Sequence, residues 1–435
     1  MTNKIAYTNN KLTHTCYARE IRSQAIEHGI ISPDWEWLLT SVIYEHNQIK
    51  RLERLLSRIE DLMNEIWSNH YDNLEFLLQK LGIPKWMGDY IMLDNVMAPV
   101  PLRWDIIYEN NMWKVIEINT GFCLGGLNGF SMNNVRNNFY RVSGSNLDVP
   151  DLDNSFYFLA KGIIDTVGKN SIIPVIETTE GYHKYDFYLH NFVSNMNKTK
   201  AGLYISGTIN DFNFKEDCTY FKGHAVTHFI PMFNLYELNE TQENHCHFLK
   251  KIRSGEIVSL LGFRELIFSN KAFIPYLIDY AKDSLAANEA KEIVALFPSS
   301  EVLNPSNVVL FHDGDFVLKP AEGYGGNGIV CSWMCQQEEW LKALDDALSD
   351  DNLWVIQERI IGELSYMQSV DRNGKVKEGL SSVVHGLITF NGNLIGNLTR
   401  AAIGVQQPGV INAHQGAAFG LSGINLHFAA EYLYD

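Results

Sequence analysis

Apolar and polar residues follow two different periods along the chain, which predicts a mixture of helices and strands. Apolar side chains recur at helical spacing over residues 35–68. Further helices are expected near 254–267, 271–282 and 337–349. Shorter apolar runs bounded by turn residues predict strands at 353–359, 381–390 and 394–401.

Residues 155–230 show a closer alternation of helix-like segments and short apolar runs. Strands are predicted there at 172–176, 186–189, 202–205 and 225–227. Alternation of this kind is typical of an α/β unit with a parallel sheet. We therefore expect a small α/β lobe in this part of the chain.

A β-hairpin is predicted over residues 103–119. Its two strands are Arg103–Tyr108 and Met112–Asn119, and the pair Asn110–Asn111 suits the turn between them. Asparagine tolerates the left-handed backbone that such a turn requires.

The hairpin carries polar residues spaced two apart, and residues two apart in a strand point to the same face. Arg103 and Asp105 should therefore share a face, as should Glu117 and Asn119. Three oxygen ligands and one guanidinium would then converge, and oxygen ligands without Cys or His favour Mg²⁺. The spacing alone favours the simpler alternative, a surface ion pair beside an ordinary hairpin.

A second informative segment, residues 316–330, is a strand that ends in Lys319 and continues into a glycine-rich loop. An ammonium beside a backbone free of side chains can bind a polyphosphate, because bare N–H groups approach the phosphate oxygens closely. The loop lacks the Gly-Lys-Ser/Thr ending of a P-loop and the spacing of dinucleotide-binding folds. A tight hairpin between Val317–Leu318 and Ile329–Val330 explains the glycines equally well.

Five other positions carry little signal when each is taken alone. Lys271 and Arg400 occupy a segment start and a strand end, where solvated cations are common. Gln357 and Glu358 close an apolar strand and could meet ribose hydroxyls or form a strand edge. His414 is a possible base, although a structural histidine near a turn is the more frequent case.

Composition narrows the class of partner. The length of 435 residues predicts two or three lobes. The hydrophobic fraction of 46% is ordinary for a folded protein. Its formal net charge is −16, from 51 acidic and 35 basic residues, which disfavours nucleic acid or an anionic membrane as partner. A cationic substrate is compatible with that charge.

Cysteine spacing and the first residues of the chain bear on its environment. The six cysteines show no disulfide framework, and Cys331 and Cys335 lack the companions of a zinc site. The first ten residues have no signal-peptide profile, and no apolar run is long enough to span a bilayer. We therefore expect a cytoplasmic protein with free thiols.

Four stretches together carry a resemblance to a known family. They are Arg103-x-Asp105 with Glu117-x-Asn119, Asn270-Lys271-Ala272, Val317-Leu-Lys319-Pro with its glycine loop, and Arg400. In this order they resemble the ligase domain of the glutathionylspermidine synthase family, within the ATP-grasp superfamily. The resemblance covers about residues 90–130 and 255–415, and the first spacing is its most specific part.

The resemblance implies a fold and a domain order. The fold class would be α/β (α+β): an ATP-grasp fold preceded by a small α/β lobe and a helical N-terminal segment. Residues 1–90 would be the helical N-terminal region, 91–250 the metal-binding hairpin with the small lobe, and 251–435 the ATP-grasp lobe. We expect no counterpart of the amidase domain of bifunctional members.

The resemblance also assigns roles at the hairpin. Asp105, Glu117 and Asn119 would hold two Mg²⁺ ions against the phosphates of ATP. Arg103 and Arg400 would be catalytic, because they would stabilise an acyl phosphate and the charge that develops during transfer.

The remaining roles concern ATP itself. Lys271 and Lys319 would contact its phosphates, and Gln357 and Glu358 would meet the adenine and ribose. The loop would close over the γ-phosphate with Gly323, Tyr324, Gly325, Gly326 and Gly328. Tyr324 stands where the family commonly has arginine, and Glu322 before it would repel phosphate unless it faces away.

The expected activity is an ADP-forming ligation of a peptide or amino-acid carboxylate to an amine or amino acid. ATP phosphorylates the carboxylate, and the amine then displaces phosphate, which requires positioning and charge neutralisation more than a nucleophilic side chain. Two alternatives remain open: a catalytically weak ATP-binding partner protein, and a phosphotransferase on the same scaffold. The sequence identifies neither the two substrates nor the oligomeric state.

Overall fold

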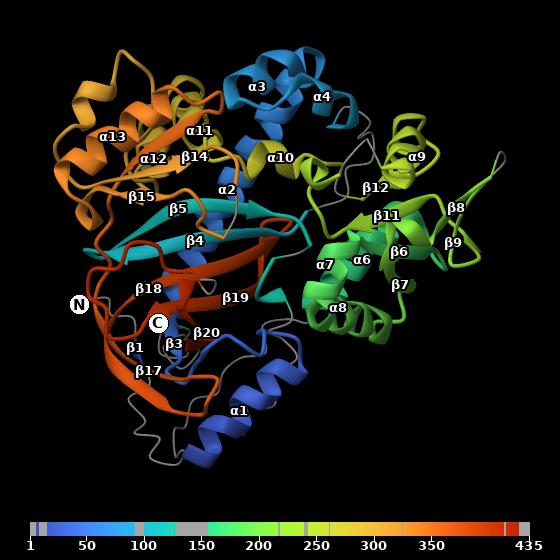
Figure 1. The fold of residues 1–435 in the computed structure, drawn as a ribbon, viewed down its shortest axis with the longest axis horizontal. Coiled ribbons are helices and arrows are strands. Elements are labelled where there is room, and N and C mark those ends of the chain that lie inside the picture. Colours follow the sequence, from blue (N-terminus) through green and yellow to red (C-terminus); the bar gives the residue numbers. More distant parts are fainter. Residues whose placement is uncertain are drawn as a thin grey trace, which may run out of the picture.

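The computed structural model describes residues 6–7, 15–91, 100–122, 124–127, 155–215, 218–238, 242–260, 262–323, 325–412 and 415–425. A seven-stranded sheet lies at its centre, in the order β17-β2-β20-β19-β18-β4-β5 (Figure 1). These strands are β2 (Trp37–Leu38), β4 (Leu102–Glu109), β5 (Met112–Thr120), β17 (Ser365–Val370), β18 (Val376–Phe390), β19 (Asn393–Ala402) and β20 (Ala418–Gly420).

The predicted hairpin is the edge of this sheet. β4 and β5 pair so that Arg103 lies opposite Asn119 and Asp105 lies opposite Glu117. The turn residues Asn110 and Asn111 have φ of 49° and 61°, the left-handed backbone expected of them. Both the hairpin and its turn are confirmed.

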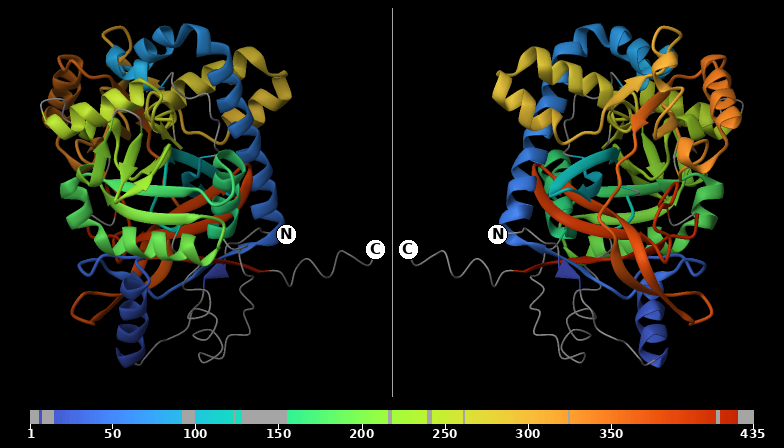
Figure 2. Two further views of the ribbon diagram at one scale, coloured as in Figure 1. Left: turned by 90° about the vertical axis from the view of Figure 1, so that its right-hand side faces the viewer. Right: turned by 90° about the vertical axis from the view of Figure 1, so that its left-hand side faces the viewer.

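Helix α2 (His46–His70) supports the central sheet from behind (Figure 2). Its buried apolar residues recur at three- and four-residue spacing and join the largest core cluster: Ile49, Leu52, Leu56, Ile59, Leu62, Met63, Ile66 and Trp67. Glu60 on the same helix accepts hydrogen bonds from the hydroxyl of Thr389 and from the Gly392 amide at 2.9 Å. Thr389 in turn accepts from Trp104 of β4 at 2.8 Å, so the helix is bonded through β18 to the hairpin.

A second, antiparallel sheet carries the glycine loop. Its order is β13-β16-β14-β15, with β13 (Ser300–Val302), β14 (Phe316–Pro320), β15 (Val330–Cys331) and β16 (Trp354–Glu358). The helices on this side are α11 (Phe273–Ser284), α12 (Ala287–Val294) and α13 (Gln337–Leu348) (Figure 1). The predicted helix near 337–349 and the strand at 353–359 are confirmed.

The small lobe contains the predicted parallel sheet, in the order β12-β11-β6-β7. Its strands are β6 (Ile172–Glu177), β7 (Leu203–Thr208), β11 (His228–Pro231) and β12 (Val258–Ser259). The neighbouring helices are α6 (Ser155–Val167), α7 (Thr179–Lys184), α8 (Asp186–Lys198) and α9 (Glu243–Arg253). A three-stranded extension of β8 (Phe212–Phe214), β9 (Thr219–Phe221) and β10 (His224–Ala225) projects from it.

The other elements flank these sheets. They are α1 (Thr15–Glu27), α3 (Leu74–Leu81), α4 (Lys85–Ile91) and α10 (Glu265–Phe268), with a three-stranded sheet of β1 (Ala6–Tyr7), β3 (Val42–Glu45) and β21 (Ser422–Asn425). Over the described residues, none of the helices combines the length and the apolar character that crossing a membrane requires.

Four sequence predictions of secondary structure are wrong. The strand expected at 225–227 is displaced, because β10 ends at Ala225 and β11 of the parallel sheet begins at His228. Residues 37–38 and 42–45 are strands rather than the start of the 35–68 helix, because distant strands pair with them. Residues 186–189 begin helix α8, whose buried Leu189, Phe192 and Met196 keep helical spacing. The predicted helix 254–267 is divided by a strand, and Gly255 and Gly262 adopt left-handed φ of 73° and 64° within it.

Candidate active site

One large cavity lies where the hairpin, the glycine loop and the small lobe meet. It measures about 1020 Å³, a volume at the upper end of the range for small-molecule sites. Of the predicted residues, Arg103, Asp105, Glu117, Asn119, Lys319, Gly323, Gly325, Gly326, Gln357, Glu358 and Arg400 line it. The structure thus brings together four segments that are far apart in the sequence.

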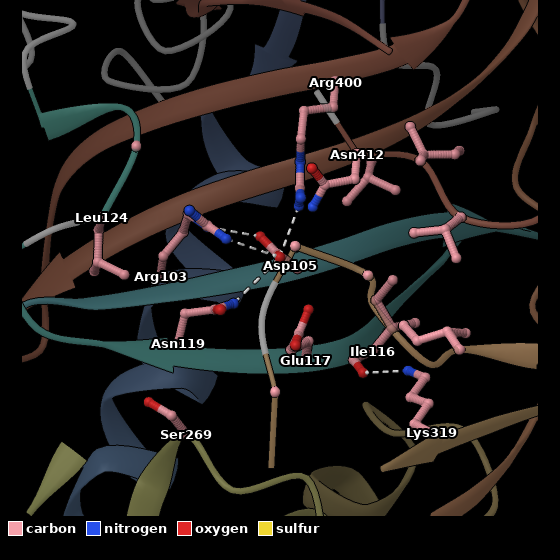
Figure 3. A pocket seen from close by; sticks show the side chains of 18 of the residues that line it. Arg103, Asp105, Ile116, Glu117, Asn119, Leu124, Ser269, Lys319, Arg400 and Asn412 are labelled. Atoms are coloured by element: carbon pink, nitrogen blue, oxygen red, sulfur yellow. Dashed lines mark hydrogen bonds and ion pairs between the residues drawn. The ribbon is translucent and has the colours of Figure 1, made fainter. Parts of the chain in front are cut away.

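Asp105 is the most enclosed of these residues, with 1% of its side chain exposed. Arg103 donates from Nε to Oδ1 at 2.9 Å and from Nη2 to Oδ2 at 3.2 Å. Arg400 of β19 reaches Oδ2 at 2.7 Å, and the Asn119 amide donates to the same oxygen at 3.2 Å (Figure 3). The surface ion pair considered from the sequence is therefore a buried cluster.

The ionisation of Asp105 follows from these contacts. Burial opposes the charged form, but the positive charges of Arg103 and Arg400 outweigh it and lower the pKa of Asp105. The carboxylate is charged near neutral pH and balances one of the two guanidinium charges, which leaves the cluster with a net positive charge.

Lys271 reaches the site from the segment between α10 and α11. Ser269 binds the end of the hairpin at the Thr120 amide, 3.0 Å away, and Asn270 donates to the Leu81 carbonyl at 3.0 Å. The Lys271 ammonium lies 3.4 Å from Glu117 Oε1 and donates to the Gly323 carbonyl at 2.7 Å. Lys271 therefore connects the hairpin to the glycine loop.

Lys319 projects from β14 toward the hairpin. Its ammonium donates to the Ile116 carbonyl at 3.2 Å (Figure 3). It also donates to Gln357 Oε1 at 2.7 Å. Burial lowers the pKa of Lys319 to about 8, although the charge of Glu117 opposes this. A bound anion would offset the burial and favour the protonated form.

The glycine loop is both a turn and a wall of the cavity, so the two interpretations of the sequence are compatible. β14 and β15 pair at Val317–Cys331 and Leu318–Val330, which confirms a hairpin shifted by one residue from the prediction. Glycines at 323, 325, 326 and 328 have φ of 138°, 70°, 78° and 72°, which side chains rarely adopt.

Two predicted residues that the structure describes lie beside the cavity rather than in its lining. Lys271 lies next to lining residues, and Gly328 packs near Pro320 beneath the loop. Tyr324 and His414 lie outside the described residues. Glu322 lines the cavity; burial raises its pKa, and its Oε1 has no hydrogen-bond partner among the described residues.

Sequence reasoning missed several charged groups of the wall, which include Glu180, Lys184, Glu237 and Glu265 as well as Arg359 and Glu177. Arg359 follows Glu358, pairs with Asp315 at 2.7 Å, and its guanidinium carbon lies 4.1 Å from the ring centroid of Trp333. Glu177 ends β6 in the small lobe, and burial raises its pKa to about 8. Arg359 could have been found from the sequence, because an apolar strand ends there in the polar run Gln357-Glu358-Arg359. Glu177 could not, because the packing of the small lobe decides whether its side chain reaches the cavity.

Comparison with known proteins rests on structure alone. No protein-family model matches the chain, and none of the curated protein sequences does. A glutathione synthetase-like effector from Globodera pallida, solved in the apo form, superposes with a TM-score of 0.65 at 10% identity. The superposition covers 96% of this chain and 98% of the effector. The chain has the fold of that protein.

Two further solved structures are more distant. A putative γ-glutamylcysteine synthetase from Methylobacillus flagellatus has a TM-score of 0.47 at 10% identity, over 82% of this chain and 86% of its own. A D-alanyl-alanine synthetase A from Vibrio cholerae has a TM-score of 0.29 at 12% identity, over 59% and 88%. These values are too low to support an argument.

The predicted α/β class is confirmed, and the chain shares the fold of the glutathione synthetase-like effector. The narrower resemblance to glutathionylspermidine synthases is not tested by these structures and stays a prediction. The roles of the individual site residues also stay predictions, because a shared fold at 10% identity assigns no residue.

Proposed function

We propose that this chain is an ATP-dependent ligase that joins a carboxylate to an amine and releases ADP and phosphate. The observation that carries the proposal is the placement of four cations at the hairpin and the glycine loop: Arg103, Lys319 and Arg400 line the cavity, and Lys271 is bonded to Gly323 of its wall. Cations beside a glycine loop suit a polyphosphate and a second anion, and the carboxylates that share the lining suit the metal ion that accompanies a polyphosphate.

The phosphates of ATP would lie between the two lysines and the glycine loop. Lys319 is buried and held by Gln357, so its ammonium has a fixed position. Lys271 is bonded to the loop carbonyl of Gly323, a contact that an incoming phosphate would replace. Gln357 and Glu358 remain the proposed contacts for adenine and ribose.

The donors near the hairpin suit Mg²⁺ better than a softer metal. Asp105, Glu117 and Asn119 offer oxygen atoms, and Mg²⁺ typically rests on one or two carboxylates and the phosphates of its substrate. Over the described residues, no three His, Cys, Asp or Glu side chains are grouped to bind a metal by themselves. When bound, Mg²⁺ neutralises phosphate charge during transfer.

The chain's own residues would act by positioning and charge. A carboxylate oxygen of the first substrate attacks the γ-phosphorus, the bond to ADP breaks, and an acyl phosphate forms. The amine nitrogen then attacks the acyl carbon, phosphate leaves, and the amide forms with loss of a proton. Arg103 and Arg400 would stabilise the negative charge on the acyl phosphate in both steps.

The first test is an ADP-release assay in which peptide and amino-acid carboxylates are crossed with amines and amino acids, with products identified by mass. ADP and phosphate should appear only when both an acid and an amine are present. Glu117→Gln should reduce turnover by about 100-fold or more with the fold intact. Glu75→Gln, whose side chain is 70% exposed, is the matched control and should leave turnover unchanged. Full activity of Glu117→Gln would contradict the metal assignment.

A second candidate function is an ATP-binding partner protein with little turnover. The saturated carboxylate of Asp105 and the acidic Glu322 beside the loop favour it. It predicts tight ATP binding without ADP release across the whole substrate panel. Coupled ADP release with any acid and amine pair would exclude it, and a stable phosphorylated product without an amide would indicate the phosphotransferase instead.

A further inference from the structure

The hydrogen-bonding capacity of Asp105 is already used within the protein. An ionised carboxylate offers about four acceptor positions on its two oxygens. Four N–H donors fill them: two from Arg103, one from Arg400 and one from Asn119, at 2.9, 3.2, 2.7 and 3.2 Å. A metal ion at Asp105 would have to replace at least one of these bonds.

The sheet itself builds this cluster. Arg103 and Asp105 share one face of β4, and Arg400 reaches across β18 from β19. Gly386 of β18 pairs with Asp105, and a Cβ there would lie 3.2 Å from Arg103 Cδ and 2.9 Å from Leu398 Cγ. The glycine therefore leaves room for the stem of Arg103, so the backbone is shaped for the contact between Arg103 and Asp105.

Glu117 presents the opposite situation, although it lies directly across from Asp105 in the hairpin. Its side chain is 28% exposed, and its cationic neighbour Lys271 is 3.4 Å away. A divalent ion would meet two cations at either carboxylate, the guanidinium groups at Asp105 and the ammonium groups of Lys271 and Lys319 at Glu117. The two positions therefore differ in the hydrogen bonds that already occupy Asp105, not in the number of nearby positive charges.

We propose that Asp105 is a positioning residue that fixes Arg103 and Arg400 as a two-guanidinium site for an anionic substrate group, and that Mg²⁺ binds at Glu117 and the Asn119 amide oxygen instead. The anion is a carboxylate or a phosphoryl group. Arg400 Nε is buried and has no hydrogen-bond partner among the described residues, so it retains a donor that Asp105 does not use. The identity of the anion rests on the proposed function; the role of Asp105 does not.

The decisive experiment uses the wild-type chain, crystallised with Mn²⁺ and a non-hydrolysable ATP analogue. Anomalous scattering should place Mn²⁺ in bonding contact with Glu117 and the phosphates, while Asp105 still contacts both arginines. An Asp105–Mn²⁺ distance of about 2.1 Å, a bond to a small divalent ion, would overturn the proposal.

Arginine modification by phenylglyoxal, mapped by mass spectrometry, tests the positioning role without nucleotide or activity. Asp105→Asn should raise the modification rate of Arg103 and Arg400 about tenfold, whereas Glu117→Gln should not change it. Arg51, 67% exposed, is the internal reference. Equal modification rates in wild type and Asp105→Asn would refute the positioning role of Asp105.

Electron paramagnetic resonance titration of Mn²⁺ with the ATP analogue separates the two carboxylates. Glu117→Gln should weaken Mn²⁺ binding about 10- to 100-fold, and Asp105→Asn, whose amide oxygen can still accept from Asn119, should weaken it clearly less. A loss in Asp105→Asn as large as that in Glu117→Gln, with its thermal unfolding unchanged, would return Asp105 to the metal site. If wild type binds neither Mn²⁺ nor the analogue, the proposed function fails, and arginine modification alone decides the role of Asp105.

Discussion

The hairpin β4–β5 and the glycine loop face the same cavity but hold their chemistry in different ways. The hairpin is paired along its length, bonded to β18, and connected through Thr389 to Glu60 of helix α2. The loop joins two strands that share only two residue pairs, and its glycines have left-handed backbones. The hairpin therefore holds its charged side chains in fixed positions. The loop, in contrast, offers backbone groups that can adjust to what they contact.

The largest effect on turnover is expected at Lys319 of β14, whose buried ammonium has a fixed position. Lys319→Met should lower turnover by about 100- to 1,000-fold, because the ammonium stabilises charge in a site that excludes water. Lys282→Met removes an ammonium whose side chain is 55% exposed and is the matched control. A loss of less than about threefold, measured in the ADP-release assay, would remove Lys319 from the proposed mechanism.

The same lysine predicts a dependence on pH. Burial lowers the pKa of Lys319 to about 8, so its ammonium is present below that pH and lost above it. Affinity for ATP, measured by calorimetry, should therefore fall as pH rises through about 8. Lys319→Met should lose this dependence; the same decline in the variant would assign it to another group.

A smaller effect is expected in the adaptable part of the loop. Gly326 has φ of 78°, and a Cβ there would lie 2.8 Å from Val410 and 3.0 Å from Gln415. Gly326→Ala should weaken ATP binding about tenfold, because both the backbone strain and the contact displace the loop.

Gly255 supplies the control for that variant. Its φ of 73° is similar, but a Cβ there would meet no atom within 4 Å. Gly255→Ala should therefore lower stability, measured by chemical denaturation, without changing ATP affinity. Equal ATP affinity in both variants would mean that the loop does not contact the nucleotide.

The smallest effect concerns the support behind the hairpin. Burial raises the pKa of Glu60 to about 7 from 4.5, so the folded state retains a proton that the unfolded state loses. Stability should fall as pH rises through this interval, by about 1 kcal/mol between pH 6 and 8.

Glu60→Gln should remove that part of the pH dependence while keeping an acceptor for the Gly392 amide, which lies 2.9 Å from Glu60. Chemical denaturation at several pH values gives the measurement. If the free energy of unfolding of the variant depends on pH as that of wild type does, Glu60 is not the group responsible for this dependence.

Predictions from the sequence succeeded where the geometry is local. The shared face of Arg103 and Asp105 follows from the period of a strand, and the turn at Asn110–Asn111 follows from backbone preference. The first part of the 35–68 helix failed because strands from the far end of the chain pair with it, and an apolar run of that kind fits either structure. The helix prediction at 254–267 is wrong because Gly255 and Gly262 adopt left-handed backbones that interrupt a helix.

The sequence by itself determined the fold class, the hairpin, and the candidate residues Arg103, Asp105, Glu117 and Lys319. Only the tertiary structure decided that Arg400 reaches Asp105 across β18 and that Lys271 lies between Glu117 and the glycine loop. The physical reason is the range of the interactions. Strand period and turn preference depend on neighbouring residues, whereas strand order and the approach of distant charges depend on how the whole chain packs.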